Sequence, residues 1–529
     1  MNAALEKRIK RQIIGKPHRF LAIVPLGFEQ TLVDELEAIR LETRAQSVEG
    51  SCAVQSAELP HVTGDGKVEF TAKITEAWKV VAYSRIANRA LMHIADFKAE
   101  NFREFEKKAS EIPFELYLAT NHQPLTTIHV TCKHSRLYHS DAIAERLQKI
   151  ICKTFPSLGP STPALHASAQ DDKIAKHQSK AFTPLKASET SDLNTRTSKR
   201  SDLTPQASYP QHLYVTLIDD RCTIWLDLAG EELYKRGHER FVNDAPLKET
   251  IAAAMLFEAI HLAQKQEILR LQASPSAQDD TSERTQATPS HISHSALHIT
   301  LFDPMAGSGT FSLEAAYISN KLIPGVCRDF ALKHQPTFKE TTWNYILRRE
   351  TRDEGRENSN SAIAQNAKSK NLNIVTSDIS ERAVEIIKHN VECSPLASTE
   401  AKPIQPKLKD FFSYTAKEIA EICGDTSPII VLNPPYGKRL DFDAPKLYTK
   451  IGHKLTELAR DLKHFGKELT VAILAPKDDS RPGNPYTCTA NLLHECPALS
   501  PEHNANAKHI VTSHGGITLN VFITKLKSI

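Results

Sequence analysis

Short apolar segments alternate with helical segments in the second half of the chain, and this order limits the possible folds more than any other feature. Strands are expected at 297–302, 373–376, 429–432 and 469–474, and helices at 311–321, 381–391 and 447–465. Regular alternation of this kind is typical of a parallel sheet with helices on both faces. The segments 510–513 and 518–524 flank Gly515-Gly516 and predict an antiparallel hairpin. We therefore expect an α/β parallel sheet that ends in a hairpin.

The first 230 residues have a different pattern, which predicts a mixed α+β region. Apolar residues mark a strand at 20–24, and the spacing of Leu32, Val33, Leu36 and Ile39 predicts a helix over 29–40. A second strand is expected at 127–132, followed by a helix that begins near Ser140. The segments 213–218 and 222–228 are separated by Asp219-Asp220-Arg221, which indicates a hairpin.

Three polar stretches interrupt these patterns, at 157–210, 272–295 and 349–370. Each offers too little apolar surface to offset the entropy of ordering a chain, so each is interpreted as a surface insertion or linker. The remaining sequence divides into two predicted regions. The first covers residues 18–230 and the second covers residues 231–529.

A glycine-rich segment, 303–310, follows the first strand of the predicted parallel sheet. Ligands of such sheets bind beyond the carboxyl ends of the strands. Gly307 and Gly309 would let the backbone approach a ligand closely, although a tight strand-to-helix turn would use the same residues. A phosphate-binding P-loop is excluded because no Gly-Lys pair is followed by Ser or Thr. A dinucleotide-binding fingerprint is disfavoured, because Ser312 stands where it needs a third glycine or an alanine.

Two aspartates follow the next strands. Asp378 ends the second strand, where its carboxylate could accept hydrogen bonds from a ribose diol. The same residue could instead cap the following helix. Asp410 is a candidate for the tip of a third strand, where it could hold an adenine amino group beside Phe411, or could simply be a loop residue.

The strongest local signal is Asn433-Pro434-Pro435-Tyr436, directly after the strand at 429–432. Two prolines cannot continue a central strand, and neither offers an N–H group that would compete for acceptors. The Asn433 side chain and the Pro434 carbonyl could both accept hydrogen bonds from an exocyclic amino group, and Tyr436 could stack on a flat base. A Pro-Pro turn with an asparagine cap is the structural alternative.

Charge, cysteine content and hydropathy exclude several classes of protein. The formal net charge is only +3, so nucleic-acid binding would depend on local basic patches. Nine cysteines without a Cys-x-x-Cys pair favour a reducing compartment, and we expect a cytoplasmic location. No apolar run is long enough to span a bilayer, and we expect no membrane association. His291, His294 and His298 lack nearby cysteines, so no metal site is predicted.

Taken together, these motifs resemble the class I S-adenosylmethionine-dependent methyltransferases that modify planar amino groups. Segments 233–238 and 245–250 resemble the stretch that precedes the catalytic sheet in THUMP-domain guanine-N2 RNA methyltransferases. Segments 25–29 and 133–141 resemble the N-terminal signature and the THUMP segment of those enzymes. The resemblance covers 20–155 and 213–529 and is strongest to the bacterial large-subunit (23S) rRNA guanine-N2 methyltransferases.

The resemblance implies a Rossmann-like class I methyltransferase sheet preceded by a ferredoxin-like and THUMP RNA-binding region. It implies that S-adenosylmethionine is the cofactor and that Asn433, Pro434, Pro435 and Tyr436 hold the guanine. The residues implied to bind the cofactor are Asp303, Ala306, Gly307, Ser308, Gly309, Asp378, Asp410, Pro246, Leu247 and Lys248.

The resemblance also implies methyl transfer to the N2 amino group of a guanine in RNA, with large-subunit rRNA as the favoured substrate. RNA would dock through Lys133, His134, Arg136 and Lys153, unless these residues form an ordinary solvated surface. The alternatives are methylation of tRNA guanine, of DNA adenine at N6 or of a protein glutamine. A non-catalytic RNA-binding factor in ribosome assembly is a further alternative.

Overall fold

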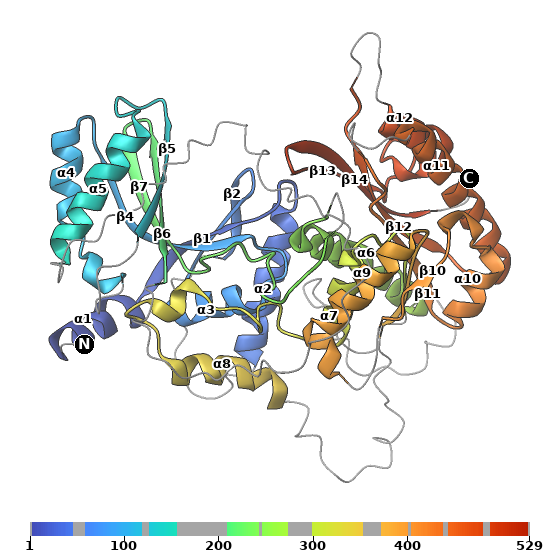
Figure 1. The fold of residues 1–529 in the computed structure, drawn as a ribbon, viewed down its shortest axis with the longest axis horizontal. Helices are drawn as coiled ribbons and strands as arrows, with labels where there is room; N and C mark the ends of the chain where they lie inside the picture. Colours follow the sequence, from blue (N-terminus) through green and yellow to red (C-terminus); the bar gives the residue numbers. More distant parts are fainter. Residues whose placement is uncertain are drawn as a thin grey trace, which may run out of the picture. The chain divides into compact units, whose positions relative to one another are not determined.

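A computed structural model describes residues 3–45, 59–118, 126–155, 209–242, 246–272, 299–352, 372–399, 404–436, 443–479 and 487–526 (Figure 1). The chain forms two compact units. Unit 1 comprises residues 1–94 and 225–529, and unit 2 comprises residues 95–224. The predicted domains, 18–230 and 231–529, stay a prediction. The predicted polar insertions and the three histidines at 291, 294 and 298 lie almost wholly outside the described residues.

The N-terminal part of unit 1 has a ferredoxin-like βαββαβ order. Its elements are α1 (Ala3–Ile9), the π-helix η1 (Lys10–Ile14), β1 (Pro17–Ile23), α2 (Glu29–Ala45), β2 (His61–Gly64), β3 (Lys67–Lys73), α3 (Ile74–Tyr83) and β4 (Arg89–Lys98). The strand order is β2-β3-β1-β4, and each described pair is antiparallel. This order of strands and helices is the ferredoxin-like arrangement that the sequence predicted.

Unit 2 contains α4 (Phe102–Ser110), η2 (Phe114–Leu116), β5 (Thr126–Lys133), α5 (Ser140–Thr154) and β6 (Gln211–Ile218). The strands β4 and β7 (Arg221–Asp227) have residues in both units. Asp219 and Asp220 have φ values of 50° and 63° and connect β6 to β7. Two residues with positive φ are the turn that a tight hairpin needs, so the predicted hairpin is confirmed.

The C-terminal part of unit 1 carries the second sheet, in the order β10-β9-β8-β11-β12-β14-β13. Its strands are β8 (Ile299–Asp303), β9 (Asn373–Asp378), β10 (Lys407–Leu408), β11 (Ser427–Leu432), β12 (Leu469–Pro476), β13 (Lys508–His514) and β14 (Ile517–Leu526). The first five are parallel, and β14 and β13 are antiparallel. The predicted parallel sheet with a terminal hairpin is therefore confirmed.

The helices of this part are α6 (Glu249–Gln272), α7 (Thr310–Ser319), α8 (Glu340–Arg352), α9 (Glu381–Glu392), α10 (Ala416–Cys423), α11 (Ala444–Leu462) and α12 (Cys488–Glu495). Short 3-10 helices lie at η4 (Ala331–His334), η6 (Pro395–Ser398), η7 (Phe411–Ser413), η8 (Lys463–Phe465) and η9 (Pro497–Leu499). Helices of this part pack on both faces of the sheet (Figure 1).

The core explains why the central strands contain almost only apolar residues. Ile430, Leu432, Val471 and Ile473 face a cluster that also contains side chains of α10, α11 and α12. The alternate residues of β11 and β12 are equally buried, and α6 packs against these strands. A strand with helices on both faces has no solvent-facing side, so its sequence shows a continuous apolar run.

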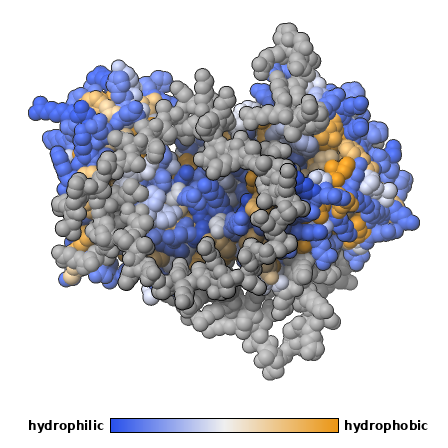
Figure 2. Space-filling view, viewed as in Figure 1, coloured by the Kyte–Doolittle hydropathy of each residue, from blue (hydrophilic) through white to orange (hydrophobic). Residues whose placement is uncertain are grey.

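The described surface on the face shown in Figure 2 is mostly hydrophilic. Among the described residues, no helix combines the length and the apolar character that crossing a membrane requires.

Candidate active site

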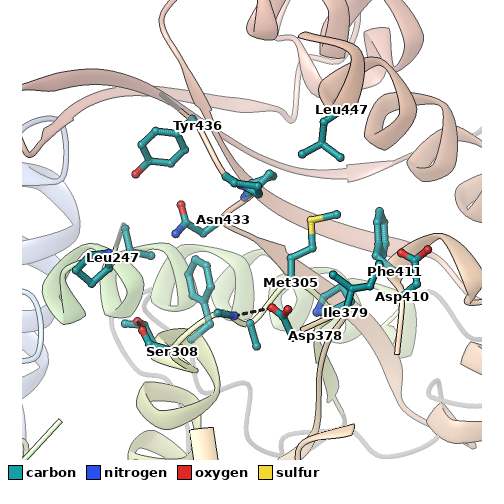
Figure 3. A pocket seen from close by; sticks show the side chains of 18 of the residues that line it. Leu247, Met305, Ser308, Asp378, Ile379, Asp410, Phe411, Asn433, Tyr436 and Leu447 are labelled. Carbon is teal, nitrogen blue, oxygen red and sulfur yellow. Dashed lines mark hydrogen bonds between the residues drawn. The ribbon is translucent and has the colours of Figure 1, made fainter. Parts of the chain in front are cut away.

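A cavity of about 520 Å³ lies in unit 1 beyond the carboxyl ends of β8, β9, β10 and β11. Because these strands are parallel neighbours, the segments that follow them meet at one edge of the sheet. Figure 3 shows Asn433 and Tyr436 on one side of the cavity and Ser308, Met305 and Asp378 on the other. The lining residues are Pro246, Leu247, Pro304, Met305, Ala306, Gly307, Ser308, Thr310, Phe311, Asp378, Ile379, Asp410, Phe411, Phe412, Asn433, Pro434, Pro435, Tyr436, Leu447 and Lys450.

The glycine turn has the backbone conformation that the sequence led us to expect. Gly307 and Gly309 have φ values of 56° and 77°, which residues other than glycine rarely adopt. A Cβ atom on Gly307 would project into open space, and this residue lines the cavity. On Gly309 the same atom would approach Ile387 of α9 to 3.1 Å. Gly307 thus leaves room for a ligand, whereas Gly309 caps α7 and permits close packing on α9.

Asp378 fixes the glycine turn from the neighbouring strand. Its Oδ2 accepts a 2.9 Å hydrogen bond from the backbone N–H of Gly307, and its Oδ1 accepts one of 2.9 Å from Ser380. The cap of α9 is the Ser380 side chain, which accepts from Ala383. Asp378 is therefore not needed as a helix cap, and it lines the cavity with its carboxylate joined to the glycine turn (Figure 3).

Asp303 lies beneath the turn and does not line the cavity. Its Oδ2 accepts hydrogen bonds from the backbone N–H of Ser312 at 3.2 Å and from the Ser312 hydroxyl at 2.8 Å. Oδ1 is buried without a hydrogen-bond partner. Burial raises the pKa of this carboxyl to about 7, although the bonds from Ser312 act in the opposite direction. The structure thus places Asp303 as a support for the start of α7.

Asp410 follows the two-residue strand β10 and lines the cavity, as predicted for a third strand tip. Its Oδ1 accepts a 3.1 Å hydrogen bond from the backbone N–H of Phe412, so Asp410 caps the start of η7. Phe411, which we expected beside an adenine ring, is 2% exposed and belongs to the core cluster. The half-buried Phe412 and the 72% exposed Ile379 provide more apolar surface beside Asp410.

Asn433 and Tyr436 present polar atoms that have no partner within the described part of the chain. The Asn433 Oδ1 and the Tyr436 hydroxyl are both buried and accept or donate no hydrogen bond. Because Asn433 Oδ1 is not engaged by a nearby N–H, the alternative of an asparagine-capped turn is not what the structure shows. Burial raises the pKa of Tyr436 to about 12, so its hydroxyl stays protonated. An unpaired buried acceptor in a cavity is a binding group for a ligand that carries N–H donors.

The segment before α6 forms another wall. Pro246 and Leu247 line the cavity, and the carbonyl of Pro246 lies 2.6 Å from Nε2 of His514, at the end of β13. Lys248 does not line the cavity, because its Nζ lies 4.7 Å from the ring centre of Tyr234 and 3.9 Å from a carboxylate oxygen of Glu232.

Several lining residues were not anticipated from the sequence. Ile379 could have been suspected, because it directly follows Asp378. Leu447 and Lys450 come from α11, which begins after the Asn-Pro-Pro-Tyr segment and carries no recognisable signature. Met305 lies within the glycine-rich segment and Phe311 directly follows it, but in the sequence both look like ordinary apolar residues.

The predicted RNA-docking residues lie in unit 2. Lys133 and His134 are exposed at the end of β5. Arg136 is also exposed, but it pairs with Glu100, and its backbone N–H donates to Asp220 at 2.7 Å. Lys153 lies in the last turn of α5, about 20 Å along the helix from its start. The structure thus brings the first three residues together but not Lys153.

Residues 292–466 match a family model described as the RMKL-like methyltransferase domain. This part of the chain is a methyltransferase domain. The match contains the glycine turn, Asp378, Asp410 and Asn433, so the cavity belongs to the methyltransferase domain. The prediction of a methyltransferase is confirmed, whereas the N2 amino group of an RNA guanine as its target stays a prediction. The match also supports the predicted cofactor, S-adenosylmethionine.

Two relatives whose names refer to RNA match most of this chain. "Putative RNA methyltransferase YpsC" of Bacillus subtilis (strain 168) is 26% identical over 427 residues, which are 80% of each chain. "Ribosomal RNA large subunit methyltransferase K/L" of Syntrophotalea carbinolica is 22% identical over 446 residues, 83% of this chain and 47% of the relative. The chain thus spans about half the length of the K/L relative.

A solved structure supports the fold of the methyltransferase. SMU.472, described as "a putative methyltransferase complexed with SAH", has a TM-score of 0.59 and 19% identity, and the match covers 97% of this chain and 99% of that one. At this identity the likeness concerns the fold. The predicted Rossmann-like class I methyltransferase architecture is therefore confirmed.

Proposed function

We propose that the protein transfers a methyl group from S-adenosylmethionine to the exocyclic N2 amino group of a guanine in RNA, with large-subunit rRNA as the substrate. The observation that carries this proposal is the unpaired, buried Oδ1 of Asn433, a residue that lines the same cavity as the glycine turn. An amino group offers two N–H donors, and an amide oxygen held at a strand exit is a matching acceptor.

The cavity has the groups that S-adenosylmethionine needs. The open space at Gly307 leaves room for the cofactor close to the backbone, and Asp378 and Asp410 present carboxylates to hydroxyl and amino groups. Ile379 and Phe412 offer apolar surface to the adenine ring. When bound, the cofactor supplies a methyl group on a positively charged sulfur.

Asn433 and Tyr436 would position the base. Accepting a hydrogen bond from the amino group orients it and raises the electron density on its nitrogen. Orientation of this kind can lower a barrier by roughly 7–11 kcal/mol in the best cases. Tyr436, neutral because burial raises its pKa, would present its ring or its unpaired hydroxyl to the base. No residue of the cavity is assigned as a general base.

RNA as the substrate is favoured by the names of the relatives and by the exposed basic residues Lys133 and His134 of unit 2. A base inside folded RNA must leave its stack to enter a cavity of this kind. We propose that Lys133, His134 and Arg136 contact RNA phosphates and that the protein works in the cytoplasm. Lys153 would form a separate contact.

The deciding experiment separates substrate classes. The full chain is incubated with methyl-labelled S-adenosylmethionine and, separately, with unmodified large-subunit rRNA, tRNA, DNA and a protein extract. Label in rRNA that digestion identifies as N2-methylguanosine is expected. Label in tRNA alone, in DNA as N6-methyladenine, or in glutamine would replace the proposed substrate. Absence of label from every pool, with cofactor binding intact, would favour a non-catalytic binding protein.

A further inference from the structure

A second cluster of polar side chains lies next to the glycine turn but outside the cavity. It consists of Glu239, His389 and Cys393, whose ligand atoms all lie within 4.8 Å of one another. None of the three lines the cavity. His389 lies in the last turn of α9 and Cys393 is its C-cap, so the two side chains are four residues apart and share one face of the helix end. Glu239 approaches from the segment that precedes α6.

The distance between two of these side chains is compatible with the coordination of a zinc ion. Zinc binds sulfur at about 2.3 Å and imidazole nitrogen at about 2.0 Å with tetrahedral angles, which places the two ligand atoms about 3.5 Å apart. The Cys393 Sγ and the His389 Nε2 lie 3.5 Å apart and form a hydrogen bond, which a metal ion held by both atoms would replace. A carboxylate is a third zinc ligand of the usual kind, and water can occupy the fourth position.

The surroundings of the cluster also suit a cation. The carbonyl groups at the C-terminal end of a helix carry partial negative charge, and His389 and Cys393 lie at that end of α9. The ring of Phe241 stacks on the His389 imidazole, with centroids 3.9 Å apart and an angle of 12° between the rings. This contact restricts the orientation of the imidazole.

Between the two helix ligands lies Asn390, which joins three parts of the domain. Its side chain accepts from the N–H of Phe241 at 2.8 Å and donates to the Phe241 carbonyl at 2.9 Å. It also donates to the carbonyl of Ser308 in the glycine turn, at 3.0 Å. A metal ion on Glu239, His389 and Cys393 would therefore hold the segment around Phe241 against α9, next to the glycine turn.

We propose that Glu239, His389 and Cys393, with water as the fourth ligand, form a zinc site that fastens the segment preceding α6 to the end of α9. The site lies outside the chemistry of methyl transfer and depends only on the fold. This proposal departs from the prediction that the chain holds no metal. The sequence did not reveal the site because Glu239 lies far along the chain from His389 and Cys393.

The test measures metal binding by the full chain. Protein stripped with a chelator is titrated with Zn²⁺, and with Co²⁺ as a spectroscopic probe. We expect one Zn²⁺ per chain, and one Co²⁺ with a thiolate charge-transfer band and a tetrahedral visible spectrum. Mg²⁺ should not displace Co²⁺. Removal of outer partners of a metal site typically weakens affinity by 10- to 100-fold, so Cys393→Ser should weaken Zn²⁺ binding by more than about 100-fold.

Cys327→Ser is the matched control, because Cys327 is an exposed cysteine of the same unit and lies outside the cluster. This variant should bind Zn²⁺ like the unaltered protein and keep the Co²⁺ band. Folding of each variant is checked by circular dichroism. The proposal is overturned if the unaltered chain binds no stoichiometric Zn²⁺, or if Cys393→Ser and His389→Ala both bind it with unchanged affinity.

Discussion

Arg236 and Glu314 form a buried ion pair with two parallel hydrogen bonds, from Nε to Oε1 at 2.9 Å and from Nη2 to Oε2 at 3.0 Å. Their side chains are 2% and 1% exposed. Arg236 also donates to the carbonyl of Arg85, just beyond α3, while Glu314 lies on α7 behind the glycine turn. The pair therefore links the ferredoxin-like part of unit 1 to the methyltransferase domain.

Breaking this pair should destabilise unit 1 strongly. Glu314→Gln leaves the Arg236 guanidinium charge buried without its counter-ion, which typically costs about 3–5 kcal/mol. Urea unfolding measures the loss. Lys235→Ala removes the partner of Glu231 in an exposed pair and should change stability by about 1 kcal/mol or less. Similar effects of the two substitutions would contradict the importance given to the buried pair.

Much of the site was predictable because it depends on the order of strands. Parallel strands place Gly307, Asp378 and Asn433 at one edge of the sheet, and each follows an apolar run that is easy to detect. Contacts between distant segments leave no such pattern. Only the folded structure shows that Arg236 contacts Glu314 and that Glu239 lies beside His389, because each pair joins segments that are distant in the sequence.

Side-chain direction was the second limit on prediction from sequence. Lys248 is adjacent to Leu247, yet one packs on Tyr234 and the other lines the cavity. Lys153 has the same charge as Lys133, but it lies in the last turn of α5, whereas Lys133 ends β5, the strand before that helix. The sequence does not fix either arrangement. The first depends on the direction in which each adjacent side chain points, and the second depends on the length of α5.

Asn433→Ala should abolish most methyl transfer while leaving cofactor affinity unchanged. The substitution removes the unpaired acceptor and leaves the glycine turn and Asp378 intact. Loss of one group that stabilises a transition state typically lowers the rate by about 10²–10³-fold. Turnover is measured with saturating RNA, and affinity by calorimetric titration with S-adenosylhomocysteine. The exposed Asn506 supplies the matched control, Asn506→Ala, which should retain full turnover.

Gly307→Ala should weaken cofactor binding by at least about 10-fold. The new methyl group would occupy space in the cavity, and the left-handed backbone adds about 1–2 kcal/mol of strain. Gly466→Ala is a close control, since Gly466 has a φ of 68° and open space around its Cβ but does not line the cavity. Both variants should lose similar stability. Equal cofactor affinity in the two would refute the role of Gly307.

Asp303 should make stability depend on pH. Its pKa is raised to about 7 from an ordinary 3.8. At any pH between these two values, the folded state therefore keeps a proton on this carboxyl that the unfolded state has lost. The stabilisation is full at low pH and disappears as pH rises through 7. Between pH 5 and 8 the unaltered protein should lose roughly 2–3 kcal/mol relative to Asp303→Asn, which has no carboxyl to titrate. Parallel stability curves for the two proteins would rule this out.

Lys133→Glu should lower RNA affinity and its dependence on salt. If Lys133 contacts one phosphate, the slope of log affinity against log salt should fall by about 1. Lys107→Glu reverses another exposed charge of unit 2, on α4, and should have a smaller effect. Arg136 is less suitable for this test, because its bonds to Glu100 and Asp220 also hold the loop. Identical salt slopes for both variants would place the docking surface elsewhere.

The hydrogen bond between His514 and the Pro246 carbonyl connects the tip of the β13–β14 hairpin to the wall of the cavity. An insertion or deletion in the Gly515-Gly516 turn would therefore shift Pro246 and Leu247, although neither the turn nor the hairpin contributes a group to the reaction. The length of this hairpin therefore helps to set where the Pro246–Leu247 wall stands, and with it the width of the cavity, although no residue of the hairpin lines the cavity.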